Sequence, residues 1–215
     1  HPVGPGLLAL PGTIMTDAST PTPEAAAAAV RSQKAEGADF IKTVGLSRAN
    51  FLGAMHEANA LGIPFDGHVN SDVDVREAAK GMRAIEHLGP AETMLLSCSS
   101  DEAAIRQALA ALDPTPPQVG PQADMADVIA RIIASPLSNL PAAEIALIAR
   151  VVDTYDEAKC RALAGELVAD GSWQVPTLIR LRTMSLPDDP AYANDPNLRF
   201  IPSDTRRMWA ELAEE

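Results

Sequence analysis

The sequence predicts an α/β fold in which parallel strands alternate with helices that cover the sheet. Short apolar runs alternate with amphipathic helical segments from Thr22 to Leu88, as they do in consecutive βα units. In addition, Lys42, His68 and His87 each lie near the end of a short apolar run, and a (β/α) barrel gathers consecutive strand ends on one face. With 215 residues, 47% of them hydrophobic, the chain can form one sizeable core.

The first helix is predicted from Pro23 to Ala35, because Thr22 suits the N-cap, proline suits the first turn and good helix formers follow. Gly37 ends this helix, and a strand is expected from Ala38 to Val44. The short run Gly6 to Pro11 is a candidate piece of an earlier strand.

Ser47 predicts the N-cap of a second helix, which Gly62 ends. The apolar positions of that helix recur at helical spacing, and they are Phe51, Met55, Ala58 and Leu61. A strand then begins at Ile63, a short helix spans Val73 to Lys80, and another strand spans Ala84 to Leu88.

The alternation stops after Pro90, because the next strand candidate is Trp173 to Leu181. We interpret the intervening segment as a helical insertion that caps the barrel mouth. Ser99 and Glu102 predict a capping box for a helix ending at Leu112, and the Pro-rich residues 113–121 predict a loop. Further helices are expected over 125–134, 142–155 and 156–169. The apolar stripe of the second of these is predicted to be Ile145, Ile148, Val152 and Tyr155.

Beyond Leu181, the Pro- and Asp-rich residues 186–202 predict an extended loop, and Ser203 predicts the start of a final helix. Trp173 and Trp209 are expected to be packing residues. The chain therefore divides into βα units over 1–90, a helical insertion over 91–170, and a later strand, loop and helix over 171–215.

Charge and composition exclude several classes of partner. The formal charge of −12, with 29 acidic against 17 basic residues, would repel phosphate backbones, so no nucleic acid partner is expected. No apolar stretch reaches the roughly 18 residues of a membrane span, so no membrane partner is expected. Neither a phosphate-binding Gly-rich loop nor a G-x-S-x-G elbow is present. The expected partner is a small-molecule substrate.

Cys98 and Cys160 fit neither a CxxC redox motif nor a zinc-knuckle spacing. Each can be a buried small hydrophobic residue. Both lie on predicted helices that bracket the inserted segment, so a disulfide would close that segment in an oxidising compartment. The compartment is left open: periplasmic or secreted if the disulfide forms, and otherwise cytoplasmic.

Each candidate site residue also has an ordinary interpretation. Lys42 can be an exposed lysine at a strand end, and a single histidine on an apolar strand is usually a packed core or rim residue. His68 and His87 lie one βα unit apart, both at strand ends, and this spacing favours a shared metal site. His56 lies within a predicted helix, where a solvent-facing or packing role is expected, and His1 is terminal.

Several segments together resemble the amidohydrolase superfamily, specifically its imidazolonepropionase-like and Xaa-Pro dipeptidase-like members. The segments are Gly37-Ala38-Asp39-Phe40-Ile41-Lys42, Ala58-Asn59-Ala60-Leu61-Gly62-Ile63-Pro64, Gly67-His68, Ala84-Ile85-Glu86-His87 and Trp173-Gln174-Val175-Pro176-Thr177-Leu178. The resemblance is strong from about Glu24 to Gly89 and from about Asp156 to Leu181, which together make up less than half of the chain.

The resemblance implies part of a (β/α)₈ TIM-type barrel, about strands 4 to 7, with a large helical insertion. It also implies two divalent metal ions, expected to be zinc. Lys42 on the fourth strand would be carbamylated and bridge the ions, with His68 and His87 as ligands from the fifth and sixth strands. The implied activity is attack of metal-bound hydroxide on a C–N bond of an amide, dipeptide or cyclic amide.

The chain departs from the family pattern in two places. It lacks the His-x-His pair of the first strand, and it ends at Glu215 before an eighth strand with its Asp. We therefore expect the remainder of the barrel, or a second copy of the chain, to pair with the open strand edges. The isolated chain is then expected to be inactive by itself. The alternative is a catalytically silent fragment or module that binds a ligand or partner without turnover.

Thr177 and Arg180 are candidate substrate-binding residues at the mouth of the last predicted strand, against structural or surface roles. Asp66 and Glu86 are left out of the ligand set. Because neighbouring residues of a strand point to opposite faces, Glu86 is expected to point toward the helices when His87 points into the site. No catalytic acid or base is assigned.

Overall fold

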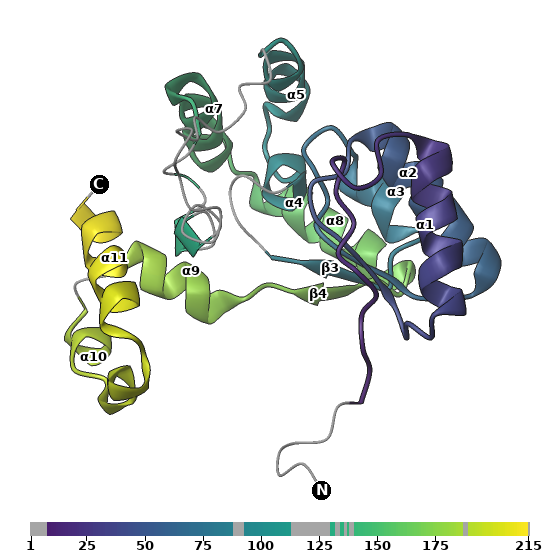
Figure 1. Cartoon of the computed structure of the whole chain (residues 1–215). Coiled ribbons are helices and arrows are strands. Elements are labelled where there is room, and N and C mark those ends of the chain that lie inside the picture. The colour runs from purple at the N-terminus through teal and green to yellow at the C-terminus, as the bar shows by residue number, and fades with distance from the viewer. Residues whose placement is uncertain are drawn as a thin grey trace, which may run out of the picture.

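The computed structural model describes residues 8–87, 93–112, 130, 131, 134, 135, 137, 140–186 and 189–214. Within them, four parallel strands form one sheet in the order β1-β2-β3-β4, and helices cover one of its faces (Figure 1). In chain order the elements are α1 (Pro23–Ala35), β1 (Ile41–Thr43), α2 (Arg48–Leu61), β2 (Phe65–Gly67), α3 (Val75–Ala79), β3 (Ala84–Glu86), α4 (Thr93–Ser97), α5 (Glu102–Ala110), α7 (Ala142–Asp153), α8 (Glu157–Ala169), β4 (Trp173–Val175), α9 (Leu178–Ser185), α10 (Pro190–Ala193), the 3-10 helix η2 (Pro196–Phe200) and α11 (Ser203–Glu214).

The predicted α/β class is confirmed, and α1 begins and ends as predicted. The Thr22 hydroxyl accepts a hydrogen bond from the backbone N–H of Ala25 at 3.1 Å. The strands are shorter than predicted, with three residues each. Their flanking residues lie outside the sheet ladder, although several of them still donate backbone hydrogen bonds to a neighbouring strand.

Helix α2 begins after Ser47 as predicted, but the Ser47 side chain does not cap it. Instead, Asp17 accepts hydrogen bonds from the Ser47 backbone N–H at 3.0 Å and from its hydroxyl at 3.1 Å. Asp72, from the loop after β2, accepts one from the Arg48 backbone N–H at 2.8 Å. Carboxylates distant in sequence thus satisfy this helix N-terminus, which local sequence cannot show.

The two faces of the sheet differ in character. The helix-covered face carries the buried side chains Ile41 of β1, Phe65 of β2 and Ile85 of β3, each at most 3% exposed. These side chains pack against residues of α1, α2, α3 and α8 in one hydrophobic cluster. The opposite face, here called the open face, carries Lys42, Asp66, Ala84, Glu86, Trp173 and Val175, as the strand register and the alternation of side chains require.

The segment before α1 lies parallel to β1. Single parallel bridges join Pro11 to Phe40 and Met15 to Thr43, and the Met15 N–H donates to the Lys42 carbonyl at 2.9 Å. The predicted earlier strand is therefore represented by two isolated bridges rather than a ladder. Its first residues, Gly6 and Leu7, lie outside the described residues.

The predicted capping box in the inserted segment is wrong. The Ser99 hydroxyl lies 2.6 Å from the Thr154 hydroxyl, and the Glu102 carboxylate accepts from Lys159 at 2.6 Å and from Arg106 at 3.1 Å. The Ser99 hydroxyl does accept a hydrogen bond from the Asp101 N–H at 3.0 Å just before α5, but the Glu102 side chain is engaged in tertiary contacts, so the reciprocal pair of a capping box does not form. Helix α4 was not predicted, and the predicted loop over 113–121 and most of the predicted helix over 125–134 lie outside the described residues.

Helix α7 buries a different stripe from the predicted one. Ile145, Val152 and Tyr155 are 42%, 58% and 50% exposed, whereas Ile148 and Val151 are 8% and 4% exposed. Val151 packs in a second hydrophobic cluster with Leu96 of α4 and Ile105 of α5, with Leu147 at its edge. The position of α4 and α5 therefore selects which of two overlapping apolar stripes is buried.

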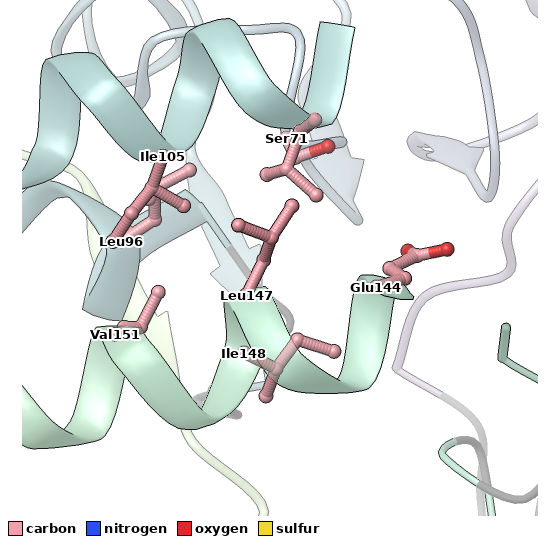
Figure 2. Close-up of a pocket in the computed structure, with 8 residues that line it drawn as sticks. Ser71, Leu96, Ile105, Glu144, Leu147, Ile148 and Val151 are labelled. Carbon is pink, nitrogen blue, oxygen red and sulfur yellow. The ribbon is translucent and has the colours of Figure 1, made fainter. Parts of the chain in front are cut away.

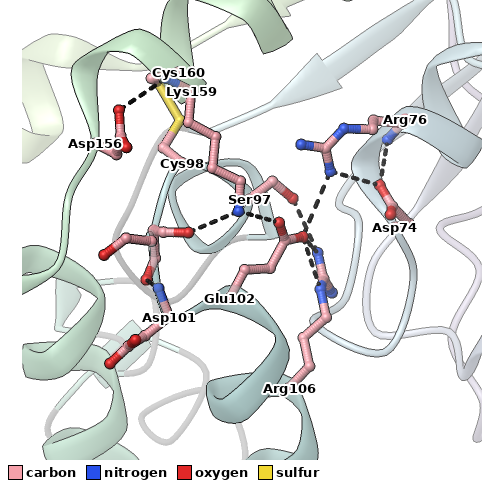
Figure 3. Close-up of polar contacts among 12 residues, drawn as sticks. Asp74, Arg76, Ser97, Cys98, Asp101, Glu102, Arg106, Asp156, Lys159 and Cys160 are labelled. Atoms are coloured by element: carbon pink, nitrogen blue, oxygen red, sulfur yellow. Dashed lines mark hydrogen bonds and ion pairs between the residues drawn. A yellow bond between two sulfur atoms is a disulfide. The ribbon is translucent and has the colours of Figure 1, made fainter.

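A disulfide between Cys98 and Cys160 ties the end of α4 to α8 (Figure 3). Next to it, Lys159 donates to the Ser99 carbonyl at 2.7 Å and to Glu102, and the Asp156 N–H donates to the Cys98 carbonyl at 2.9 Å. Burial raises the pKa of Glu102, but hydrogen bonds from Lys159 and Arg106 outweigh it, and the net pKa is lowered.

The C-terminal part differs most from prediction. The last strand ends at Val175 instead of Leu181, and α9 begins at Leu178. Two short helices, α10 and η2, replace much of the predicted loop, while α11 begins at Ser203 as predicted. Figure 1 shows α9 leading away from the sheet toward α10 and α11. Trp173 and Trp209 are 72% and 42% exposed, so their predicted packing role is wrong for the chain alone.

None of the helices within the described ranges combines the length and the apolar character needed to cross a bilayer.

Candidate metal site

Four side chains meet where β1, β2 and β3 end: Lys42, His68, Glu86 and His87. The Lys42 ammonium forms an ion pair with Glu86 Oε2, and the same carboxylate oxygen lies 3.7 Å from His87 Nε2. The rings of His68 and His87 are edge to face, with centroids 4.5 Å apart. One potential ligand atom from each of His68, Glu86 and His87 lies within 4.8 Å of the other two. The three residues singled out from sequence are thus brought together, and Glu86 joins them.

The end of β2 presents His68 because Gly67 allows two strands to approach closely. Gly67 has φ +129°, and a Cβ there would lie 2.3 Å from the Thr43 carbonyl oxygen. This close approach lets the His68 N–H donate to that same carbonyl at 3.0 Å, while the Thr43 hydroxyl lies 3.3 Å from the His68 carbonyl oxygen. The backbone of His68 is therefore fixed to β1 on both sides.

The end of β3 explains why the expectation for Glu86 was wrong. His87 adopts the left-handed conformation, with φ 66°, directly after the last strand residue. Strict alternation applies only while the backbone remains extended, so a left-handed residue turns its own side chain away from the alternating direction. Glu86 and His87 can then face the same site, and the His87 N–H donates to the Val175 carbonyl at 2.8 Å.

The site is partly buried and its charges are close together. The side chains of Lys42, His87 and Glu86 are 16%, 21% and 23% exposed. Burial lowers the pKa of Lys42, and the neighbouring Asp66 carboxylate opposes this effect. Burial also raises the pKa of Asp66, whereas a hydrogen bond from the Ala84 N–H at 2.9 Å and the nearby cations of Arg83 and Lys42 lower it in part. The site thus disfavours an additional unpaired charge.

The donor set fits a divalent metal ion. Two imidazoles and one carboxylate are a ligand combination that zinc takes in proteins, and they leave a coordination position open. The half-buried site limits competition from bulk water. In the unmodified lysine form, however, the Lys42 ammonium pairs with Glu86, so it competes with an incoming cation for that carboxylate.

The two substrate-binding candidates lie beyond β4. The Thr177 side chain reaches into the site, with its hydroxyl 3.0 Å from His87 Nδ1. Arg180 lies in α9 rather than on a strand, and its side chain lies outside what the structure describes. The strand predicted to carry both residues ends before either of them.

A small cavity elsewhere is not a substrate site. It lies between α4, α5 and α7, and its volume of about 20 Å³ is close to that of one water molecule (Figure 2). It is lined by Ser71, Leu96, Ile105, Leu109, Glu144, Leu147, Ile148 and Val151. None of the strand-end residues of the metal site lines it.

Comparisons with known proteins give no family assignment. No family model matches the chain, and no curated protein matches its sequence. Among solved structures, a bottromycin amidohydrolase is 17% identical with a TM-score of 0.33, over 87% of this chain and 50% of that chain. An uncharacterized protein of known crystal structure is 18% identical with a TM-score of 0.30, over 89% of this chain and 48% of that one. The chain spans about half the length of each, and TM-scores this low establish neither a shared fold nor an activity.

Proposed function

We propose that this chain is a segment of a metal-dependent hydrolase of the amidohydrolase type, which cleaves a C–N bond in a small amide, dipeptide or cyclic amide. The observation that carries the proposal is the convergence of Lys42, His68, Glu86 and His87 at three successive strand ends. Parallel α/β folds place their active sites at this end of the sheet. The segment sequences that resemble the amidohydrolase superfamily support the reaction class.

In this proposal His68 and His87 hold metal through neutral imidazoles, and Lys42 holds it as a carbamate, with zinc as the preferred ion and two ions in the complete site. Glu86 is an additional candidate ligand, which the structure brings into the set. A bound divalent ion would polarise a substrate carbonyl and lower the pKa of water. The protein groups contribute by holding the ligands in place and by limiting access of bulk water.

The open face of the sheet supports the proposal that the site is completed by further polypeptide. Trp173 and Val175 are 72% and 45% exposed there, beside the partly buried Lys42 and Glu86. We propose that the rest of a (β/α)₈ barrel, or a second copy of this chain, covers this face. The remaining ligands and the proton-transferring acid would then come from that polypeptide, and the open strand edges would be paired.

Zinc binding by the chain tests the proposal directly. We expect zinc binding that is measurable by isothermal titration calorimetry, and we expect His68→Ala and His87→Ala each to weaken it by more than about 10-fold. His56→Ala is the matched control, because His56 lies exposed on α2, away from the strand ends. Equal affinity in all four proteins would remove the histidines from the site, and absence of binding in the wild type would contradict the metal-binding role.

A catalytically silent module is the second candidate, and one observation favours it. The Lys42 ammonium already neutralises Glu86, so this carboxylate has a counter-charge without a metal ion. This alternative predicts that zinc at about 100 μM, ample for sites of micromolar affinity, leaves the thermal unfolding temperature unchanged. An upward shift that requires both His68 and His87 would support the hydrolase proposal instead.

A further inference from the structure

We propose that Thr177 is a positioning residue for His87: its hydroxyl holds the imidazole so that Nε2 is turned toward Glu86 and the metal position. This inference rests on the proposed metal-binding role of His87. It replaces the predicted substrate-binding role of Thr177 with a contact to the protein itself.

The first observation is the geometry at the ends of β3 and β4. The Thr177 hydroxyl lies 3.0 Å from His87 Nδ1, and the His87 N–H donates to the Val175 carbonyl at 2.8 Å. One hydrogen bond fixes the backbone of His87 and the other fixes its ring. One partner is the last residue of β4 and the other lies two residues further along the chain, so the ends of β3 and β4 are joined at two points.

The second observation is the backbone conformation. In the part of the chain that the structure describes, the non-glycine residues with positive φ are His87, at 66°, and Thr177, at 48°. A left-handed conformation is unusual and strained for a β-branched residue such as Thr177. The two residues with positive φ are also hydrogen-bonded to each other. Backbone strain at Thr177 therefore coincides with its hydrogen bond to His87, which supports a role for that bond.

The third observation is that Thr177 does not use its hydroxyl in the usual way. It occupies the N-cap position of α9, where a threonine side chain normally accepts a hydrogen bond from the helix. Here no side-chain cap bond is made, and the hydroxyl faces His87 instead. Thr177 therefore contributes to the strand-end site rather than to the start of its own helix.

The contact matters because the hydrogen bond at one imidazole nitrogen is linked to the protonation of the other nitrogen. A neutral histidine has one nitrogen that carries hydrogen and one that carries a lone pair, and a hydroxyl beside it can accept from the N–H or donate to the lone pair. The proposal assigns the first arrangement to His87, with the Thr177 hydroxyl as the acceptor. When Nδ1–H donates to the Thr177 hydroxyl, Nε2 keeps its lone pair. Nε2 and Glu86 Oε2, which also pairs with the Lys42 ammonium, lie 3.7 Å apart. A metal ion between them would be held by both.

Three substitutions separate this role from a structural one. Thr177→Val removes the hydroxyl at nearly constant shape, Thr177→Ser keeps the hydroxyl, and Thr177→Gly removes it while suiting the left-handed backbone. We expect zinc affinity to fall about 10- to 100-fold in the Val and Gly variants and to change less than about 3-fold in the Ser variant. A purely structural role predicts the opposite for Thr177→Gly, because relief of backbone strain would stabilise the site.

The tautomer of His87, read from its ring ¹⁵N chemical shifts, gives a measurement that needs no metal. At about pH 8, where an ordinary histidine is neutral, we expect hydrogen on Nδ1 in the wild type and the Ser variant, and a mixture of tautomers in the Val and Gly variants. An unchanged tautomer in Thr177→Gly would overturn the inference, as would hydrogen on Nε2 in the wild type. If no variant and no wild-type protein binds zinc, the proposed function fails, and these shifts alone decide the role of Thr177.

Discussion

Lys42 is the residue at which the two candidate functions differ most. Its ammonium pairs with Glu86, and its pKa is lowered mainly by burial. A buried lysine with a lowered pKa has more of the neutral amine that carbamylation requires, whereas a paired ammonium holds the cluster together without metal. The same position can therefore supply a metal ligand or a counter-ion, and the difference is measurable.

The proposed two-zinc site predicts that Lys42→Ala lowers the zinc content of the metal-loaded protein from about two ions per chain to about one, because a bridging ligand is lost. Metal analysis by mass spectrometry measures this change. Lys80→Ala is the control, since Lys80 is exposed at the end of α3. Equal zinc content in wild type and Lys42→Ala would make Lys42 a counter-ion of Glu86 rather than a ligand.

At this scale the sequence predicted the convergence of Lys42, His68 and His87, since parallel strand ends meet at one edge of the sheet. It failed for Glu86, because alternation was assumed to continue through His87. A left-handed residue at the strand end breaks alternation, and no local pattern requires one there. The weak available signal is that histidine adopts this conformation more often than most residues do.

At the scale of elements, α7 shows how a predicted helix can still bury the wrong stripe. Val151 and Val152 are neighbours in sequence, yet they are 4% and 58% exposed. The period of apolar residues is compatible with either stripe. The choice is made by α4 and α5, which supply Leu96 and Ile105 to the cluster around Val151.

Truncation of these two valines is therefore expected to have unequal effects. Val151→Ala should lower the free energy of unfolding by about 2 kcal/mol, because it removes buried methyl groups and leaves a cavity. Val152→Ala should change it by less than about 0.5 kcal/mol, as for other exposed positions. Urea denaturation of both variants measures the difference. A larger loss for Val152→Ala would restore the stripe predicted from sequence.

The tie between α5 and α8 is expected to depend on pH through Glu102. Its pKa is lowered in the folded protein, so its carboxylate adds stability above the unfolded pKa of about 4.3, and this contribution is lost as pH falls through the lower folded value. Glu102→Gln should cost about 1–2 kcal/mol at neutral pH, and the cost should shrink below about pH 4.

Urea unfolding of wild type and Glu102→Gln at neutral and acidic pH tests this expectation. Glu157→Gln is the matched control, because the Glu157–Arg161 pair on α8 is 74% and 78% exposed and an exposed ion pair contributes little. A cost for Glu102→Gln that stays constant down to about pH 3 would show that the charge of Glu102 is not what joins the helices.

At the scale of the whole molecule, the order of strands and helices was predictable because the capping residues and apolar runs of each βα unit lie within that unit's own sequence. Whether the sheet closes into a barrel was not predictable from the sequence. The described residues supply a four-stranded sheet with helices on one face, and whether it belongs to a barrel depends on chain that would cover Trp173 and Val175. Sequence periodicity reports which residues are apolar, but it does not report what covers them.

The open face is expected to mediate self-association when the chain is isolated, because among the described residues it combines the edge strand β4 with exposed apolar side chains. Sedimentation velocity should show species larger than a monomer, and Trp173→Glu should shift them toward the monomer. Val168→Glu is the control, since Val168 is 80% exposed on α8. A monomeric wild type would contradict association through this face.

The Cys98–Cys160 disulfide has a practical consequence for anyone who handles this protein. The two cysteines are separated by 62 positions, so a peptide bond cut anywhere between them leaves two fragments that remain covalently attached. Such a nicked molecule would migrate near its full mass in electrophoresis without reductant and would separate into two bands with it. Intact mass without reduction is therefore no proof that the backbone of this chain is continuous.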